Sequence, residues 1–232
     1  MINKVKKFLR ENAMTKDLYR FFGNLKNWKK QKEIRKKRRA LQKNGKELIH
    51  FLQDVLCEEK FFFDMGTLLG IVRENRLLGH DLDIDLGIFL ESKEEIKKVR
   101  EHLFNNGFKL TFSYSIDEIG IVEDSFIKNN IKFDLFYYHR EENADVVYLM
   151  YKVPTSNLPE GSLNVVKASC LHINEIEKVD FKGKKINVPK NKESYLAERY
   201  GKNWTIPDKN YVYWKGPSTS PTDYIGHIIK HI

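Results

Sequence analysis

The sequence contains little cysteine and no long apolar run. Its 232 residues include only two cysteines, Cys57 and Cys170, and no CxxC pair. Two thiols do not make a disulfide framework, and zinc-ligand spacing is absent, so we expect reduced cysteines and a cytoplasmic setting. No apolar stretch approaches the roughly 18 residues of a membrane-spanning helix. The basic N-terminus is not followed by an apolar core, so it lacks the pattern of a secretory signal.

Acidic residues are scarce near the N-terminus. The first 50 positions hold 17 of the 41 Lys and Arg residues but only 4 of the 32 Asp and Glu residues. The rest of the chain is mildly acidic, so the net charge of +9 does not predict that the protein as a whole binds nucleic acid. We expect a basic helical N-terminal segment, residues 1–45, followed by a folded domain, residues 46–232.

The most basic run, KKRR at residues 36–39, lies in a stretch with apolar residues at helical spacing, in which Gly45 is a weak point or a break. Three interpretations of this run stay open. It forms a solvated helix face, or it contacts an anionic membrane surface, where each Lys or Arg contributes about 1 kcal/mol. In the third, it contacts nucleic acid or an anionic glycan.

Downstream, helical and alternating patterns follow one another. Ser92 and Gly107 fit the two ends of a helix, and Asn129–Asn130 predicts a tight hairpin turn. Helices are predicted at 27–60, 67–75, 92–107 and 192–201, and strands at 60–64, 83–91, 108–115, 120–128, 131–139, 145–153 and 184–189. Residues 203–221, rich in aromatics, Pro and Gly, are expected to form a structured loop or tail. The order predicts a mixed α/β or α+β domain around one sheet.

Three aspartates stand at every second position: Asp81 directly before the predicted strand at 83–91, and Asp83 and Asp85 within it. Alternate residues of a strand point to the same face, so these carboxylates would raise one another's pKa. A divalent cation such as Mg²⁺, or Mn²⁺, would relieve the repulsion, and Mg²⁺ is typically held by one or two carboxylates together with substrate phosphates. The alternative is a polar strand face exposed to water.

A further carboxylate, Asp134, lies in the otherwise apolar stretch IKFDLFYY. An isolated acid in such a strand is costly unless it is paired or bound to a metal. We predict that Asp134 completes the metal site. The alternative is a structural salt bridge to Arg73 or Lys132.

The segment GTLLG, residues 66–70, precedes the aspartates and resembles a phosphate cradle. Gly66 lets backbone amides approach a phosphate, Thr67 supplies a hydroxyl, and the start of a helix favours an anion. Arg73 follows on the same helix and is suited to bidentate pairing with phosphate oxygens. A phosphate cradle before a carboxylate strand is the equipment of metal-assisted phosphoryl transfer.

These motifs together resemble a known family. The glycine-hydroxyl helix, the D-x-D strand and the later solitary aspartate resemble the DNA polymerase β-like nucleotidyltransferase superfamily. The string DMGTLLGIVRENRLLGHDLDIDLGIF, residues 64–89, is more narrowly similar to the LicD/fukutin family, whose members typically read GTLLGxxR and then W-D-x-D-x-D-x-G. The resemblance is good over residues 46–90 and looser through KFDLFYY and ESYLAERYGKNW. It implies an α+β, nucleotidyltransferase-like fold with a mixed central sheet flanked by helices.

The resemblance also implies an activity. Such an enzyme would move a phospho-alcohol group (phosphocholine, phosphoribitol, phosphoglycerol or a relative) from a CDP-activated donor to a sugar hydroxyl of a surface polysaccharide or lipid-linked glycan. The basic N-terminal segment fits an acceptor assembled at the inner face of a membrane.

The resemblance further assigns roles to residues. Asp83 and Asp85 would be the metal-binding pair and Asp134 the third ligand, which we expect also to help deprotonate the acceptor hydroxyl. The donor phosphates would be held by Gly66, Thr67 and Arg73. Asp81 would support the metal from nearby. His80 stands where the family usually has Trp, and it is either an acid–base group or a structural histidine hydrogen-bonded to a neighbouring Asp.

Two other functions are compatible with the same residues. A nucleotidyltransferase would use the three aspartates to add NMP from an NTP to a small molecule or RNA. A non-catalytic glycan- or membrane-associated binding module would keep the fold alone, although a degenerate enzyme usually loses a ligand. An aromatic cluster, Trp204, Tyr211, Tyr213 and Trp214, suits either sugar or choline binding or closure of the core.

Overall fold

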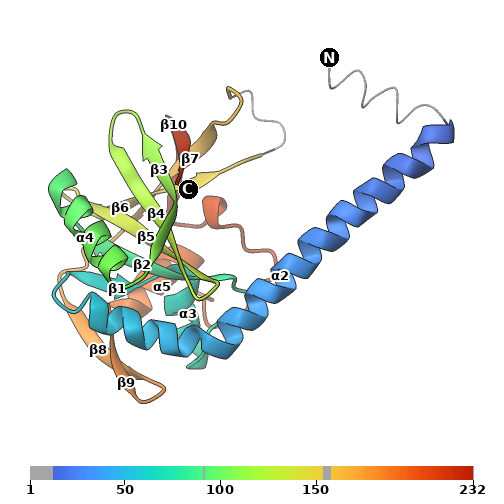
Figure 1. The fold of residues 1–232 in the computed structure, drawn as a ribbon. Coiled ribbons are helices and arrows are strands. Elements are labelled where there is room, and N and C mark those ends of the chain that lie inside the picture. The colour runs from blue at the N-terminus through green and yellow to red at the C-terminus, as the bar shows by residue number, and fades with distance from the viewer. Residues whose placement is uncertain (1–12, 91, 154–157, 232) are drawn as a thin grey trace.

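The protein is an α+β domain with a long projecting helix (Figure 1). The computed structural model describes residues 13–90, 92–153 and 158–231, and side chains from residue 27 onward. The 43-residue helix α2 (Ala13–Val55) stands away from the domain over its first half and changes direction where it reaches the domain. Its second half packs into the core, where Leu41, Ile49 and Leu52 are fully buried. Of the predicted basic segment, residues 1–12 lie outside the described residues.

The predicted helices and strands of the domain's first two-thirds are present, and the sequence gives physical reasons for their ends. Ser92 caps its helix by accepting a hydrogen bond from the Glu95 amide, and Asn129 and Asn130 adopt the left-handed backbone of a tight hairpin turn. The elements are β1 (Phe61–Phe63), α3 (Met65–Glu74), β2 (Asp83–Phe89), α4 (Lys93–Asn105), β3 (Lys109–Ile116), β4 (Gly120–Lys128), β5 (Ile131–Arg140) and β6 (Asp145–Tyr151).

The last third of the chain contains more strands than the sequence predicted. The elements are β7 (Leu163–Cys170), β8 (Ile176–Phe181), β9 (Lys184–Pro189), α5 (Lys192–Tyr200), the short 3₁₀ helix η1 (Tyr213–Lys215) and β10 (Thr219–Lys230). Only β9 and α5 were predicted. The expected loop or tail at 203–221 ends in the first residues of β10, which pairs with both β3 and β7.

Apart from β8 and β9, which pair as a separate two-stranded sheet, one mixed sheet organises most of these elements. Its strand order is β1-β2-β5-β4-β3-β10-β7-β6, and β6 pairs again with the end of β5, so the strands from β5 to β6 close into a ring. All neighbours are antiparallel except β2 and β5, which run parallel. This parallel pair places the two acidic strands side by side.

Helices cover the sheet in two groups. One apolar cluster packs α2 and α4 against β2, β4 and β5, and a second packs α3 and α5 against β5, β6 and β7. The sequence allowed Gly45 to be a break in the helix, but α2 continues through it. A Cβ atom at this position would come within 2.5 Å of Leu77 Cδ1, so glycine allows the helix to pack closely on the domain.

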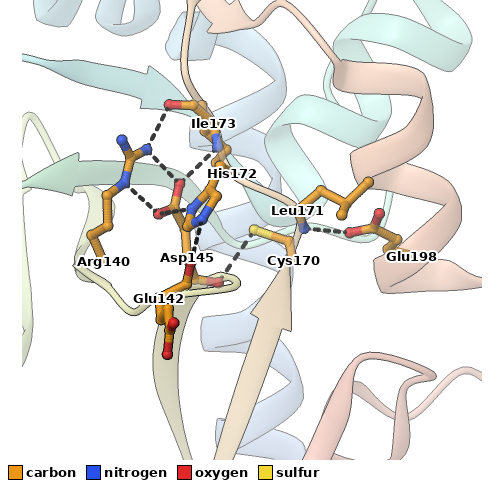
Figure 2. Close-up of polar contacts among 8 residues, drawn as sticks. All are labelled: Arg140, Glu142, Asp145, Cys170, Leu171, His172, Ile173 and Glu198. Atoms are coloured by element: carbon orange, nitrogen blue, oxygen red, sulfur yellow. Dashed lines mark hydrogen bonds and ion pairs between the residues drawn. The ribbon is translucent and has the colours of Figure 1, made fainter.

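A buried carboxylate holds the ends of β5, β6 and β7 together (Figure 2). Asp145 is fully buried and accepts hydrogen bonds from Arg140 Nε (2.9 Å), His172 Nδ1 (3.1 Å) and the Ile173 amide (2.7 Å). From the same turn, the Leu171 amide donates to Glu198 Oε2 of α5 at 2.9 Å. Burial by itself raises the pKa of Asp145, but the hydrogen bonds from Arg140, Ile173 and His172 outweigh it and lower the pKa below its ordinary value.

We expect Asp145→Ala to reduce the free energy of unfolding by about 3 kcal/mol at pH 7, because the Ile173 amide and Arg140 lose a buried acceptor. Since the folded-state pKa of Asp145 is depressed, its contribution is present above the unfolded pKa of about 4 and is lost as pH falls through the folded pKa. Urea unfolding at pH 7 and pH 3 measures both effects. Glu142→Ala changes an exposed side chain in the connection between β5 and β6. It is the matched control and should leave the free energy of unfolding within about 0.5 kcal/mol of wild type.

Candidate active site

The predicted site residues gather at one large cavity. Its volume is about 1330 Å³, and its wall includes Gly66, Arg73, His80, Asp81 and the three aspartates of β2 and β5. A typical small-molecule site holds about 300–1000 Å³. The cavity is therefore larger than a typical small-molecule site.

The parallel pairing of β2 and β5 brings the acidic residues together. Asp85 lies directly opposite Asp134, and Asp83 lies opposite Lys132. The Lys132 ammonium contacts Asp134 Oδ2 at 2.6 Å and Asp83 Oδ2 at 3.0 Å. The alternative interpretation of Asp134, an ion pair with Lys132, is thus confirmed as a contact within this cluster.

Asp134 is bonded at both of its oxygens. Besides the Lys132 contact, its Oδ1 accepts a hydrogen bond from Ser125 Oγ at 2.5 Å. Burial raises the pKa of Asp134, and Lys132 partly offsets this effect. Burial opposes the charge on Lys132, but Asp134 and Asp83 raise its pKa, so the lysine stays protonated.

Asp85 is the least compensated acid of the cluster. Burial raises its pKa well above the ordinary range, and the carboxylates of Asp83 and Asp134 raise it further. No ion pair to Asp85 is present among the described residues. The like charges that the sequence predicted to repel one another therefore lie around Asp85.

Asp81 points an unsatisfied oxygen into the same region. Its Oδ2 is buried and has no hydrogen-bond partner in the described part of the chain. Burial, followed by the charge of Asp83, raises the pKa of Asp81 to about 7. A Cβ atom on Gly66 would lie 3.3 Å from this oxygen, so glycine leaves room for Asp81. His80 is exposed, and its Nε2 lies 3.6 Å from Asp81 Oδ1, which is too long for the hydrogen bond that the structural interpretation expected.

Thr67 and Arg73, the other residues predicted to hold phosphate, have different environments. Thr67 is fully buried behind the cavity wall, where its hydroxyl accepts a hydrogen bond from the Asp85 amide at 2.9 Å and fixes β2 to α3. Arg73 lines the cavity, but its guanidinium donates to Glu74 Oε1 (2.8 Å) and to the Trp204 carbonyl (3.2 Å). An incoming phosphate would compete with Glu74 for Arg73.

The donor chemistry of the cluster fits Mg²⁺ or Mn²⁺. Hard carboxylate oxygens are the preferred ligands of these ions, and the unsatisfied oxygen of Asp81 and the uncompensated charge of Asp85 favour a cation. Within the described ranges no three acidic, histidine or cysteine side chains converge as a ready-made metal site. Lys132 stands between Asp83 and Asp134 and supplies part of the charge that a divalent ion would bring.

Sequence reasoning missed two groups of residues around this site. Glu123 of β4 is buried in the cavity wall, and its signal was an acid on the strand next to Asp134. Asp64 is fully buried at the start of α3, where it accepts hydrogen bonds from the hydroxyls of Tyr138 and Tyr195. Arg199 of α5 donates to the same two tyrosines and lines the cavity. An aspartate directly before a helix is a capping signal that could have identified Asp64.

Residues 58–191 match the model of the family described as LicD/FKTN/FKRP, nucleotidyltransferase domain. This match covers more than half of the chain and contains the whole aspartate cluster. The chain belongs to this family.

Individual relatives agree with the family match at low identity. The chain is 26% identical over 190 residues to ribitol-5-phosphate transferase FKTN of Macaca fascicularis and to that of Homo sapiens. It is 27% identical over 186 residues to the protein of the same name from Mus musculus. Each match covers 77% of this chain but only 37% of the relative, so the chain corresponds to little more than a third of their length.

Proposed function

We propose that the protein is a phosphotransferase that moves a phospho-alcohol group from a CDP-activated donor to a sugar hydroxyl of a glycan. Phosphoribitol, phosphocholine and phosphoglycerol are the candidate groups, and the acceptor is a surface polysaccharide or a lipid-linked glycan. The main support is the carboxylate cluster of β2 and β5 at a cavity large enough for donor and acceptor. The family and the name of its relatives support the reaction class.

We propose that the fold is nucleotidyltransferase-like and that the residues of the site have distinct roles. Asp83, Asp85 and Asp134 would hold Mg²⁺ or Mn²⁺, which when bound neutralises charge on the reacting phosphate. Arg73 would leave Glu74 to bind donor phosphate oxygens, and the α3 amides after Gly66 would add hydrogen-bond donors. Asp81 would accept from a water or donor group with its unsatisfied oxygen.

The test is the identity of the product. The protein is incubated with Mg²⁺, a sugar acceptor and CDP-ribitol, CDP-choline or CDP-glycerol in turn, and the acceptor is analysed by mass spectrometry. The proposal predicts an acceptor heavier by one phospho-alcohol group, together with free CMP. An acceptor carrying NMP from an NTP would support the nucleotidyltransferase alternative instead.

The projecting half of α2 suggests where the reaction takes place. Trp28 is 53% exposed with the Lys32 ammonium 5.2 Å from its ring, and exposed basic residues follow along the helix. No helix in the described residues is long and apolar enough to cross a membrane. We propose that this half of α2 lies on an anionic membrane surface at its cytoplasmic face, with Trp28 at the interface.

Replacing Lys29, Lys36 and Arg39 with glutamine should weaken binding to phosphatidylserine-containing vesicles by about 10²-fold, because each basic residue contributes about 1 kcal/mol. Co-sedimentation measures binding, and phosphatidylcholine vesicles provide the uncharged control. Turnover on a small soluble acceptor should stay unchanged. Unaltered vesicle binding by the triple variant would contradict the membrane role of this helix.

A further inference from the structure

Glu123 is a largely buried acid in the cavity wall, near the charge of Lys132. It is 8% exposed, and its carboxylate makes no hydrogen bond or ion pair within the described residues. The next residue shows that the fold can satisfy a buried acid. Asp124 points to the opposite face and accepts from Arg100 (2.6 Å), Ser113 (2.5 Å) and Tyr137 (2.5 Å). The Glu123 oxygens are not among the sealed polar atoms without a partner in the described residues, so this carboxylate opens onto the cavity, where a ligand can donate to it.

The strand register places Glu123 beside the aspartate cluster. Ser125 and Glu123 share one face of β4, since alternate residues of a strand point the same way. Ser125 donates to Asp134, and Glu123 follows two residues further, about 7 Å along the strand. Glu123 therefore lies next to the reacting groups but outside the Lys132 contacts.

Asp134, the base expected from the sequence, is poorly suited to take a proton. Both of its oxygens already accept strong hydrogen bonds, from Ser125 and from Lys132. These two contacts leave the Asp134 carboxylate engaged by groups of the protein, whereas Glu123 has no such contact among the described residues. Burial, and after it the charge of Asp134, also raises the pKa of Glu123 well above its ordinary range.

The surroundings of Glu123 suit a sugar. Tyr114 of β3 is its partner across the sheet, and Tyr213 of η1 lines the same part of the cavity. Tyr213 is 43% exposed, and its hydroxyl donates to the Met150 carbonyl at 2.7 Å, which fixes the ring. A fixed, half-exposed ring beside a free carboxylate can stack on a sugar while the carboxylate accepts from its hydroxyl.

On the basis of the proposed function, we infer that Glu123 is the acceptor-side catalytic residue, which binds the attacking sugar hydroxyl and accepts its proton. The sugar oxygen forms a bond to the phosphorus of the phospho-alcohol group. The bond from that phosphorus to the bridging oxygen breaks, and CMP leaves with the electron pair. The hydroxyl proton moves to Glu123. Tyr213 forms the wall against which the sugar is placed.

The experiment compares wild type, Glu123→Gln, Glu123→Asp and the control Glu118→Gln, an exposed acid in the β3–β4 turn. Each is assayed for transfer with a CDP-alcohol and a sugar acceptor, for donor affinity by calorimetry and for Tm. Glu123→Gln should lower kcat for transfer by about 10²-fold, as expected for the loss of a general base. Its donor Kd should stay within about twofold and its Tm should not fall. Glu123→Asp should recover part of the rate, and Glu118→Gln should match wild type.

Transfer by Glu123→Gln at a rate near that of wild type would overturn the inference while leaving the proposed function intact. Equal loss of donor affinity and transfer would overturn it too, since that pattern assigns Glu123 to the donor or to the fold. If wild type transfers no phospho-alcohol group from any donor, the proposed function fails first and this role fails with it.

Discussion

Asp85→Asn is expected to lower phospho-alcohol transfer by at least about 10³-fold and, at the same time, to stabilise the fold. The loss corresponds to about 4 kcal/mol of transition-state stabilisation, within the range for removing a charged group that supports a reacting phosphate. The gain follows because Asp85 is a half-buried acid among like charges, with its pKa raised first by loss of solvent and then by Asp83. Relief of this repulsion by about 1 kcal/mol should raise Tm by about 2–4 °C.

Asp223→Asn is the matched control, since this acid is exposed on β10, and it should change neither rate nor Tm. Quenched transfer assays measure the rate, and calorimetric melting measures Tm. Substantial turnover by Asp85→Asn would remove Asp85 from the catalytic cluster. A fall in Tm would show that Asp85 is structural and that its apparent repulsion is satisfied in the protein.

Asp64→Ala is expected to lower the free energy of unfolding by about 4 kcal/mol, and hence Tm by about 8–16 °C. Asp64 accepts from the Tyr138 hydroxyl at 2.7 Å, from Tyr195 and from the Met65 amide at 2.6 Å. Met65 adopts a left-handed φ of 45° at the start of α3, and the hydrogen bond to Asp64 holds this strained turn. Loss of the carboxylate leaves two buried hydroxyls and the helix start without their acceptor.

The matched control is Asp54→Ala, because Asp54 is 64% exposed and its ion pair among the described residues is with Lys184, so its loss should cost less than about 0.5 kcal/mol. Asp64→Asn keeps one acceptor oxygen and should show an intermediate effect. Denaturant unfolding followed by far-UV circular dichroism measures all three variants. Equal stabilities for Asp64→Ala and Asp54→Ala would contradict the network's role in holding α3.

The features that the sequence predicted correctly are local ones. Alternation predicted β2 to β6, and the caps and turn residues predicted where α4 and the β4–β5 hairpin begin and end. The aspartate spacing predicted a shared strand face for Asp81, Asp83 and Asp85. Asp83 and Asp85 do lie at alternate positions of β2, but Asp81 precedes the strand. These features depend on neighbouring residues, so they can be read from a short window.

The features that sequence missed depend on distant contacts. β10 contains Pro221 and changes register between Pro221 and Ile225, so its alternation is broken, yet it is held between β3 and β7. Lys132 and Glu123 gain their importance only when β4, β5 and β2 lie side by side. Thr67 was predicted to reach a phosphate, but packing of α3 on β2 turns its hydroxyl to the Asp85 amide.

Titration of the wild-type protein with CDP-ribitol, CDP-choline and CDP-glycerol, with Mg²⁺ and with EDTA, tests the central claim most directly. The account predicts that at least one donor binds with Mg²⁺ and that the affinity is lost with EDTA and in Asp85→Asn, while Asp223→Asn binds as wild type does. Donor affinity that is the same with Mg²⁺ and EDTA, or no nucleotide binding under either condition, would contradict a metal-dependent donor site at the aspartate cluster.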